Sequence, residues 1–309
     1  MRVAVIGVGH LGRYHVQNLI NIRKADVCGI YDIQKDRSLA VAEEFDVRVF
    51  DDLDSLLDSC DVVSLATPAT THYSIAGQIL EKGKDLFVEK PLCCSSSQAK
   101  EIINLAEKKG CILQVGHIER YNPAIVALNP LLDNPKYLEF FRIAPFNNRG
   151  TDTSVIMDLM IHDIDLLNYI LGYRKPEKIV AHGASLFSEE YDLVKAHFSY
   201  IDGVWAECTA SRVSLESKRK LRIFQQGELI DIDLSDSSVR DIKIKDYARQ
   251  EIEIEDLKIK KSNYLLNELN DFITNVNNRT KPLTGGSEAL FAIEIAEEIT
   301  CILKKQHSH

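Results

Sequence analysis

The stretch Val3-Ala-Val-Ile-Gly-Val-Gly-His-Leu-Gly12 decides the fold of the first part of the chain, because a short apolar run breaks directly into three spaced glycines. The run predicts a buried strand, and the residues after it predict a helix over 11–22. Gly7 suits a tight turn, Gly9 lets a diphosphate approach the backbone, and Gly12 lets the helix pack close to the strand. The amides at the start of that helix would then face the phosphates of a dinucleotide.

A second apolar run, Val27–Tyr31, ends in Asp32, about twenty residues after the last glycine. A carboxylate at this place accepts hydrogen bonds from the adenosine ribose hydroxyls and repels a 2′-phosphate, which favours NAD over NADP. The alternative is a glycine-rich turn of another α/β protein with a solvent-exposed aspartate. The predicted cofactor contacts in this region are Gly7, Gly9, His10, Leu11, Gly12 and Asp32.

The composition indicates a two-domain protein without nucleic-acid or membrane features. The 309 residues are about two ordinary domains long. A net charge of -9 argues against nucleic-acid binding. The cysteines include no C-x-x-C pair, so we expect reduced thiols, no metal site and a cytoplasmic location. No apolar run approaches the ~20 residues of a membrane span, and we expect no membrane partner.

Strand and helix patterns alternate from residue 1 to about 122, which predicts a Rossmann domain with a doubly wound parallel sheet. Further strand candidates are the apolar runs at 47–50, 61–66, 85–88 and 111–115. A helix over 97–109 is expected to end at Gly110. Ligands of such sheets bind beyond the strand ends. Three predicted strand ends carry unusual residues: Thr67-Pro68 with His72, Glu89-Lys90-Pro91, and Gly116-x-x-x-Arg120-Tyr121-Asn122-Pro123.

After residue 122 the pattern changes, and we expect a second, α+β domain over 123–309. Several β-rich runs between 137 and 245 follow one another without helices, with turns at Asp202-Gly203 and Gln226-Gly227. They predict one large, mostly antiparallel, open sheet. One face of that sheet would need cover, so we expect a homodimer or homotetramer through it. A last helix is predicted over 287–304.

An amphipathic helix is predicted over 154–172, and its polar face carries reactive side chains. Its predicted apolar face holds Ile156, Met160, Ile164, Leu167 and Leu171, and the opposite face holds Asp158, His162, Asp165 and Tyr169. Asp158 and His162 are four residues apart, so the carboxylate can orient the imidazole. A solvated ion pair is the alternative for these two residues. Asp163 falls beside the apolar face, and the sequence suggests no partner for it.

Taken together, these motifs resemble, in order and spacing, the Gfo/Idh/MocA family of oxidoreductases. The motifs are the glycine turn, Thr67-Pro68 with His72, Glu89-Lys90-Pro91, the segment from Gly116 to Pro123, and Asp158-x-x-x-His162-x-x-Asp165. The resemblance implies a Rossmann domain, a second domain whose open sheet mediates oligomers, and a last helix that returns toward the first domain. It also implies that Lys90, Asp158 and His162 match the family's catalytic residues. Met160 departs from the glycine that many members carry there.

The resemblance further implies an NAD-dependent dehydrogenase that oxidises a CH–OH group of a sugar or nucleotide sugar. Either Lys90 or His162 would accept the hydroxyl proton. The cofactor contacts would also include Thr67, Pro68, His72, Glu89 and Lys90, and the substrate contacts Lys90, Arg120, Tyr121, Asp158 and His162. Arg120 could equally form an interdomain ion pair. An inositol or free-sugar dehydrogenase, or a non-catalytic NAD-binding protein, is the alternative.

Within the family, the chain looks most like bacterial members that oxidise C3 of UDP-N-acetylglucosamine ahead of a transaminase in lipid A synthesis. The forms that carry this likeness are Asp158-Leu-Met-Ile-His-Asp-Ile-Asp165 and the segment 116–123. Such a substrate needs groups that bind its diphosphate. The sequence offers Arg120, Arg142, Arg149 or the N-terminus of a helix for this purpose.

Overall fold

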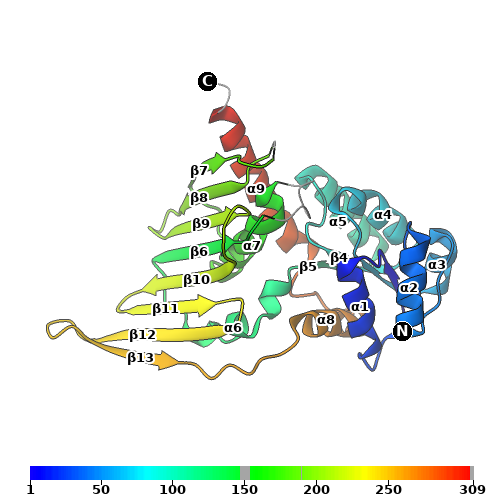
Figure 1. The fold of residues 1–309 in the computed structure, drawn as a ribbon, viewed down its shortest axis with the longest axis horizontal. Coiled ribbons are helices and arrows are strands. Elements are labelled where there is room, and N and C mark those ends of the chain that lie inside the picture. Colours follow the sequence, from blue (N-terminus) through cyan, green and yellow to red (C-terminus); the bar gives the residue numbers. More distant parts are fainter. Residues whose placement is uncertain (147–153, 189, 307–309) are drawn as a thin grey trace. The chain divides into compact units, whose positions relative to one another are not determined.

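A computed structural model describes residues 1–146, 154–188 and 190–306 (Figure 1). The chain divides into two compact units. The first comprises Met1–Ile118 and Asn263–Leu290, and the second comprises Glu119–Ser262 and the chain from Phe291 onward. This division differs from the predicted boundary after residue 122, because residues 263–290 pack with the first unit.

The first unit contains a parallel sheet with the strand order β2-β1-β3-β4-β5. The strands are β1 (Arg2–Ile6), β2 (Asp26–Tyr31), β3 (Val62–Leu65), β4 (Asp85–Glu89) and β5 (Leu113–Gly116). Val3–Ile6 and all of β3 are buried, as expected of strands covered on both faces. The strand order reverses between β1 and β3, so a ligand is expected beyond their carboxyl ends. The predicted Rossmann sheet is confirmed.

The sequence accounts for several ends of the helices in this unit. The helices within Met1–Ile118 are α1 (His10–Ile20), α2 (Lys35–Phe45), α3 (Leu53–Ser59), α4 (Ala69–Glu81) and α5 (Ser96–Lys109). Asp52 accepts a hydrogen bond from the Ser55 amide at the start of α3, and Ser95 accepts one from the Gln98 amide at the start of α5. Gly110 ends α5 with a φ of 66°, as predicted.

One predicted strand, 47–50, is reduced to a single bridge between Val49 and Ile30. It lies beside β2 at the edge of the sheet, where Phe50 donates a backbone hydrogen bond to Ile30. The ring of Phe50 occupies the space above Gly29, because a Cβ built there would lie 2.3 Å from the ring. An apolar run in the sequence does not distinguish this side-chain packing from a strand.

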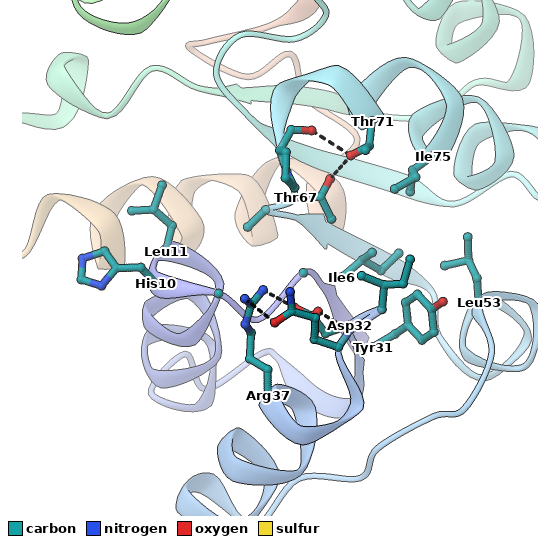
Figure 2. Close-up of a pocket in the computed structure, with 16 residues that line it drawn as sticks. Ile6, His10, Leu11, Tyr31, Asp32, Arg37, Leu53, Thr67, Thr71 and Ile75 are labelled. Atoms are coloured by element: carbon teal, nitrogen blue, oxygen red, sulfur yellow. Dashed lines mark hydrogen bonds and ion pairs between the residues drawn. The ribbon is translucent and has the colours of Figure 1, made fainter. Parts of the chain in front are cut away.

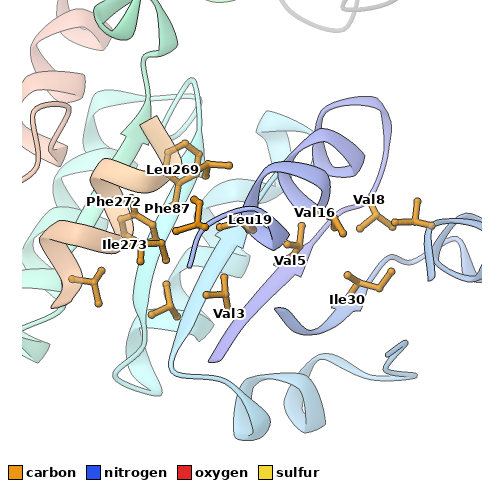
Figure 3. Packing of buried hydrophobic residues seen from close by; sticks show 14 residues of the cluster. Val3, Val5, Val8, Val16, Leu19, Ile30, Phe87, Leu269, Phe272 and Ile273 are labelled. Atoms are coloured by element: carbon orange, nitrogen blue, oxygen red, sulfur yellow. The ribbon is translucent and has the colours of Figure 1, made fainter. Parts of the chain in front are cut away.

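Helix α8 (Tyr264–Asn278) explains why the chain returns to the first unit (Figure 3). Its apolar stripe joins the cluster that β1 and α1 form, and Leu269, Phe272 and Ile273 are fully buried there. The ring of Phe272 lies 5.7 Å from that of Phe87 in an edge-on arrangement. The sequence shows the apolar stripe of α8 but not the surface against which it packs. Only the folded unit shows that this surface is the parallel sheet with α1.

The second unit contains a sheet with the strand order β13-β12-β11-β10-β6-β9-β8-β7 (Figure 1). Every neighbouring pair is antiparallel except β6 and β9, which confirms the predicted mostly antiparallel sheet. The strands are β6 (Tyr137–Ile143), β7 (Lys178–Ala184), β8 (Leu193–Ser199), β9 (Trp205–Ser211), β10 (Lys218–Gln225), β11 (Glu228–Asp233), β12 (Ser238–Asp246) and β13 (Glu251–Asp256). Strand β13 was not among the predicted strands, although Glu and Ile alternate over 251–254.

Among the residues that the structure describes, the remaining helices are short apart from α7 (Ile161–Ile170) and α9 (Gly286–Gln306). The short ones are the 3₁₀ helices η1 (Ile118–Tyr121) and η2 (Asn129–Leu131), α6 (Pro123–Val126) and the π-helical turn η3 (Ile156–Met160). Helix α7 contacts β6 and β9. The prediction of a last helix over 287–304 agrees with α9. No helix in the described ranges is long and apolar enough to cross a bilayer.

One face of the second sheet is buried and the other is largely charged. Leu138, Phe140 and Leu221 point to the buried face. The outer face carries ion pairs between neighbouring strands, such as Lys195–Glu207 and Arg222–Glu139. It also carries an aromatic row, because Tyr137 is paired in register with Trp205 on one side and with Phe224 on the other.

Candidate functional site

A cavity of about 600 Å³ lies at the carboxyl ends of β1, β2 and β3 (Figure 2). Its position agrees with the reversal in strand order. Of the predicted cofactor contacts, those that line it are Gly7, Gly9, His10, Leu11, Asp32, Thr67 and Pro68. The lining also includes Arg37, which the sequence analysis did not select.

The three glycines of the turn meet different constraints. Gly7 has a φ of +81°, and a Cβ there would lie 2.8 Å from the carbonyl oxygen of Ala66. A Cβ on Gly12 would lie 1.8 Å from the carbonyl oxygen of Gly7, so α1 could not start so close to the strand. A Cβ on Gly9 would meet only a guanidinium nitrogen of Arg37, at 3.7 Å. Gly7 and Gly12 therefore shape the turn, and Gly9 leaves open space where a diphosphate fits.

Asp32 is held by backbone amides. The Val8 amide donates to its Oδ2 and the Gln34 amide donates to its Oδ1, each at 2.9 Å. Because Val8 lies in the glycine turn, the carboxylate also anchors that turn. Arg37 Nη1 lies 3.4 Å from Oδ2. A carboxylate has about four lone-pair positions, so acceptor capacity remains for ribose hydroxyls. The cavity, the open glycine and this carboxylate together fit NAD.

His72 connects two loops at the strand ends. Its Nδ1 lies 2.8 Å from the carbonyl oxygen of Pro91, and its Nε2 lies 2.9 Å from that of Thr67. The ring is 1% exposed, and burial lowers its pKa against the opposing effect of the two carbonyl groups. A neutral imidazole donates to one of these carbonyls only. His72 does not line the cavity, and this differs from its predicted contact with the cofactor.

The side chain of Glu89 points into the first unit. Its Oε1 lies 3.0 Å from His15 Nε2, and its Oε2 accepts a hydrogen bond of 3.3 Å from the Lys90 amide. A Cβ on Gly116 would lie 2.9 Å from Oε2, so the carboxylate requires a glycine there. Burial raises the pKa of Glu89, but the hydrogen bond from His15 and nearby positive charge outweigh it and leave the pKa below its usual value.

Lys90 directly follows β4 and is half-buried. Its backbone is fixed from two directions, since its own amide binds Glu89 and the carbonyl of the next residue, Pro91, binds His72. Glu89 and His72 therefore fix the backbone on either side of the Lys90 side chain through these two hydrogen bonds. Both were predicted as cofactor contacts. His15 was not predicted as a site residue, because its partners Ser64 and Glu89 lie far away along the chain.

The predicted helix over 154–172 is not regular. Its start, Ile156–Met160, is a π-helical turn, and α-helical geometry begins at Ile161. The predicted apolar face is buried throughout, but the opposite face is not a solvated one, because Asp165 is 1% exposed. Asp158 and His162 are half-buried, and they flank the change from π to α geometry. Such π turns occur frequently at functional sites.

Two of the arginines expected near the substrate, Arg120 and Arg142, instead form ion pairs within the second unit. Arg120 binds Asp165 through Nε and Nη2, with an Nε to Oδ2 distance of 2.8 Å. Arg142 lies 2.8 Å from Asp163 and 3.0 Å from Glu119. The four side chains of Arg120, Arg142, Asp163 and Asp165 are almost fully buried. The expectation that Arg120 or Arg142 binds a substrate diphosphate is therefore corrected, and Asp163 gains the partner that the sequence did not supply.

The remaining predicted substrate residues have separate positions. Tyr121 is buried at the end of η1. The ring of Tyr169, from the predicted polar face, lies under the Arg120 guanidinium at 5.2 Å. Arg120 does form an ion pair, as the alternative prediction held, but its partner Asp165 belongs to the same unit because the observed boundary lies at residue 118 and not at 122. Arg149 lies outside the described residues.

Two family models match the chain. Residues 1–117 match an oxidoreductase family with an NAD-binding Rossmann fold, and residues 136–228 match the GFO/IDH/MocA C-terminal domain. UDP-N-acetylglucosamine 3-dehydrogenase from Acidithiobacillus ferrooxidans is 37% identical over 77% of this chain and 76% of that protein. For scyllo-inositol 2-dehydrogenase (NAD(+)) from Bacillus subtilis, the identity is 31% over 69% of this chain and 68% of that protein.

A solved structure of the Acidithiobacillus ferrooxidans enzyme has the same fold across both units. The two superpose with a TM-score of 0.92 at 32% sequence identity. The alignment covers 99% of this chain and 98% of that one.

Proposed function

The chain belongs to the Gfo/Idh/MocA family, as an NAD-dependent dehydrogenase that acts on a CH–OH group, and we propose that its substrate is UDP-N-acetylglucosamine. In this proposal the enzyme oxidises the C3 hydroxyl to a 3-keto sugar, which a transaminase converts to a 3-amino sugar for lipid A. The observation that carries the proposal is the likeness to UDP-N-acetylglucosamine 3-dehydrogenase over three quarters of the chain in sequence and nearly all of it in fold.

The reaction removes a hydride from C3 and a proton from its hydroxyl group. NAD, when bound, accepts the hydride. We assign the proton to Lys90 or His162, the two candidate bases, and Asp158 orients His162. Where His162 accepts the proton, a positive charge on Lys90 stabilises the developing alkoxide. The support for this set is the pair of family motifs that contain the three residues, together with the backbone contacts that fix Lys90.

An inositol dehydrogenase of the same family is the second candidate. The specific observation that favours it is the 31% identity to scyllo-inositol 2-dehydrogenase over 69% of the chain.

We also propose that copies of the chain associate through the outer face of the second sheet, as a dimer or tetramer. The aromatic row of Trp205, Tyr137 and Phe224 supports this, since Trp205 is 53% exposed on a face that is largely charged. Trp205→Glu should lower the molar mass measured by light scattering. An unchanged mass would place the interface elsewhere.

The substrate proposal is tested by a trapped assay. Oxidation of a secondary alcohol by NAD is uphill near neutral pH, so the mixture needs a ketone trap or an aminotransferase with its amino donor. Mass spectrometry then looks for the 3-keto or 3-amino nucleotide sugar. No such product, together with turnover of myo-inositol or a free sugar, would select the second candidate. A thermal-shift series with the same compounds and NAD supports the choice, because ligands that bind the folded state stabilise it.

A further inference from the structure

The cofactor cavity places opposite charges side by side at its ribose end. Of the described residues that line it, Arg37 is the only lysine or arginine, and Asp32 is the only carboxylate. Arg37 Nη1 lies 3.4 Å from Asp32 Oδ2, and its Nη2 donates to Gln34 Oε1 at 2.7 Å. Figure 2 shows the Arg37 guanidinium group next to the Asp32 carboxylate, with a dashed line between them.

The two side chains differ in what they leave available to a ligand. Asp32 is 4% exposed and held by two amides, whereas Arg37 is 43% exposed. Its Nη1 also lies 3.7 Å from the position of a Cβ on Gly9, at the turn expected to face the diphosphate. A phosphate on the ribose hydroxyl that Asp32 binds would therefore lie beside a guanidinium group with free donors.

We propose that Arg37 is a latent binding residue for the 2′-phosphate of NADP, so that Asp32 and Arg37 act in opposite directions on cofactor choice. The Asp32 carboxylate binds ribose hydroxyls and repels the phosphate, whereas the planar guanidinium group of Arg37 matches a phosphate in charge and geometry. The Asp32 carboxylate is then the one group that weakens NADP binding, and the preference for NAD depends on it. This inference holds for any sugar substrate.

The test measures dissociation constants for NAD and NADP, without a sugar, in four full-length proteins. These are the wild type, Asp32→Asn, Arg37→Met and the double variant. Asn keeps one oxygen acceptor for the Val8 amide, and Met keeps the length of the arginine stem without its charge. Lys35→Met is the matched control, since Lys35 also lies in the first turn of α2 but pairs with Asp51 outside the cavity.

We expect Asp32→Asn to bind NADP at least about tenfold more tightly than the wild type, as for a strong charged hydrogen bond. The double variant should lose this gain. Arg37→Met alone should weaken NADP binding by about tenfold and change NAD binding by no more than about threefold. Lys35→Met should leave both constants unchanged. In the Asp32→Asn variant, added salt should weaken the binding of NADP more than it weakens the binding of NAD, because salt screens the contact with the 2′-phosphate.

The proposal is overturned if the double variant keeps the full gain in NADP affinity. It is also overturned if the wild type already binds NADP as tightly as NAD. Should Asp32→Asn fail to fold, the ratio of NADP to NAD affinity in Arg37→Met decides, and an unchanged ratio rejects the role of Arg37. Failure of the UDP-N-acetylglucosamine proposal leaves these outcomes unaffected, because no sugar enters the measurement.

Discussion

His15 Nε2 lies 3.0 Å from Glu89 Oε1, and this contact joins the glycine-turn helix α1 to the strand end that carries Lys90. His15 Nδ1 lies 2.8 Å from the hydroxyl oxygen of Ser64, on the strand between them. A neutral imidazole with its proton on Nε2 satisfies both neighbours, since it donates to Glu89 and accepts from Ser64. The contact thus couples the position of Lys90 to the helix that the dinucleotide phosphates approach.

Replacing His15 with Phe should remove this coupling. The Glu89 carboxylate, whose side chain is 13% exposed, then loses a donor, and we expect the free energy of unfolding to fall by about 1–3 kcal/mol. Turnover should fall as well, while His15→Gln, which keeps a donor, should restore part of it. Urea unfolding and steady-state kinetics measure the two effects. His182→Phe, on the exposed part of β7, is the control, and equal losses in both variants would contradict the role of His15.

The lowered pKa of Glu89 predicts a pH dependence of stability. A carboxyl group with a lowered pKa in the folded state stabilises the fold above its ordinary pKa of 4.5, and this stabilisation is lost as the pH falls through the lowered value. Glu89→Gln should therefore be less stable than the wild type at pH 7. The difference should shrink below pH 4.5 in urea unfolding at several pH values. A constant difference would argue against a charged Glu89.

The buried pair of Arg120 and Asp165 is expected to stabilise the second unit. Arg120→Met leaves a carboxylate without its partner, so we expect a loss of about 3–5 kcal/mol in chemical unfolding. Arg174→Met is the control, because the Arg174–Asp202 pair is more than 40% exposed on both sides and should contribute less than about 1 kcal/mol. If Arg120→Met raised only the KM for the sugar and kept full stability, the substrate-binding role would return.

The glycines of the turn should respond differently to alanine. Gly12→Ala places a Cβ against the Gly7 carbonyl and should destabilise the first unit in the absence of any ligand. Gly9→Ala should fold with the stability of the wild type and bind NAD at least about tenfold more weakly, since its Cβ enters the space for the diphosphate. Thermal unfolding without ligand and NAD titration separate the two effects. NAD binding of wild-type strength by Gly9→Ala would exclude this path for the diphosphate.

For the proposed catalytic set, Lys90→Ala and His162→Ala should change NAD affinity by only a few-fold. Both should reduce turnover by about 10² or more, the usual scale for acid-base groups. Asp158→Asn should reduce turnover by an intermediate factor, because Asp158 orients His162 but does not accept the proton. Lys84→Ala, at the opposite end of β4, serves as a control. Full turnover of Lys90→Ala at saturating substrate would mean that Lys90 is misassigned.

Local patterns in the sequence determined much of the first unit. The glycine turn, Asp32 and the stop at Gly110 depend on neighbours within a few tens of residues, and all three lie where the sequence placed them. Alternation of apolar and polar residues predicted the mostly antiparallel sheet, because a strand that buries one face carries its apolar residues at every second position. The family motifs identified Lys90, Asp158 and His162 as candidates before any geometry was known.

The tertiary structure decided which charged side chains are available to ligands. The sequence made Arg120 and Arg142 candidates for binding a diphosphate, yet each lies buried against an aspartate, 45 and 21 residues further along the chain respectively. His15 found Glu89 at a separation of 74 residues, and α8 returned to cover a sheet that begins at residue 2. A buried charge must have a partner, but nothing in the local sequence says which distant side chain supplies it. Folding brings those partners together, and it leaves Arg37 beside Asp32 at the open cavity.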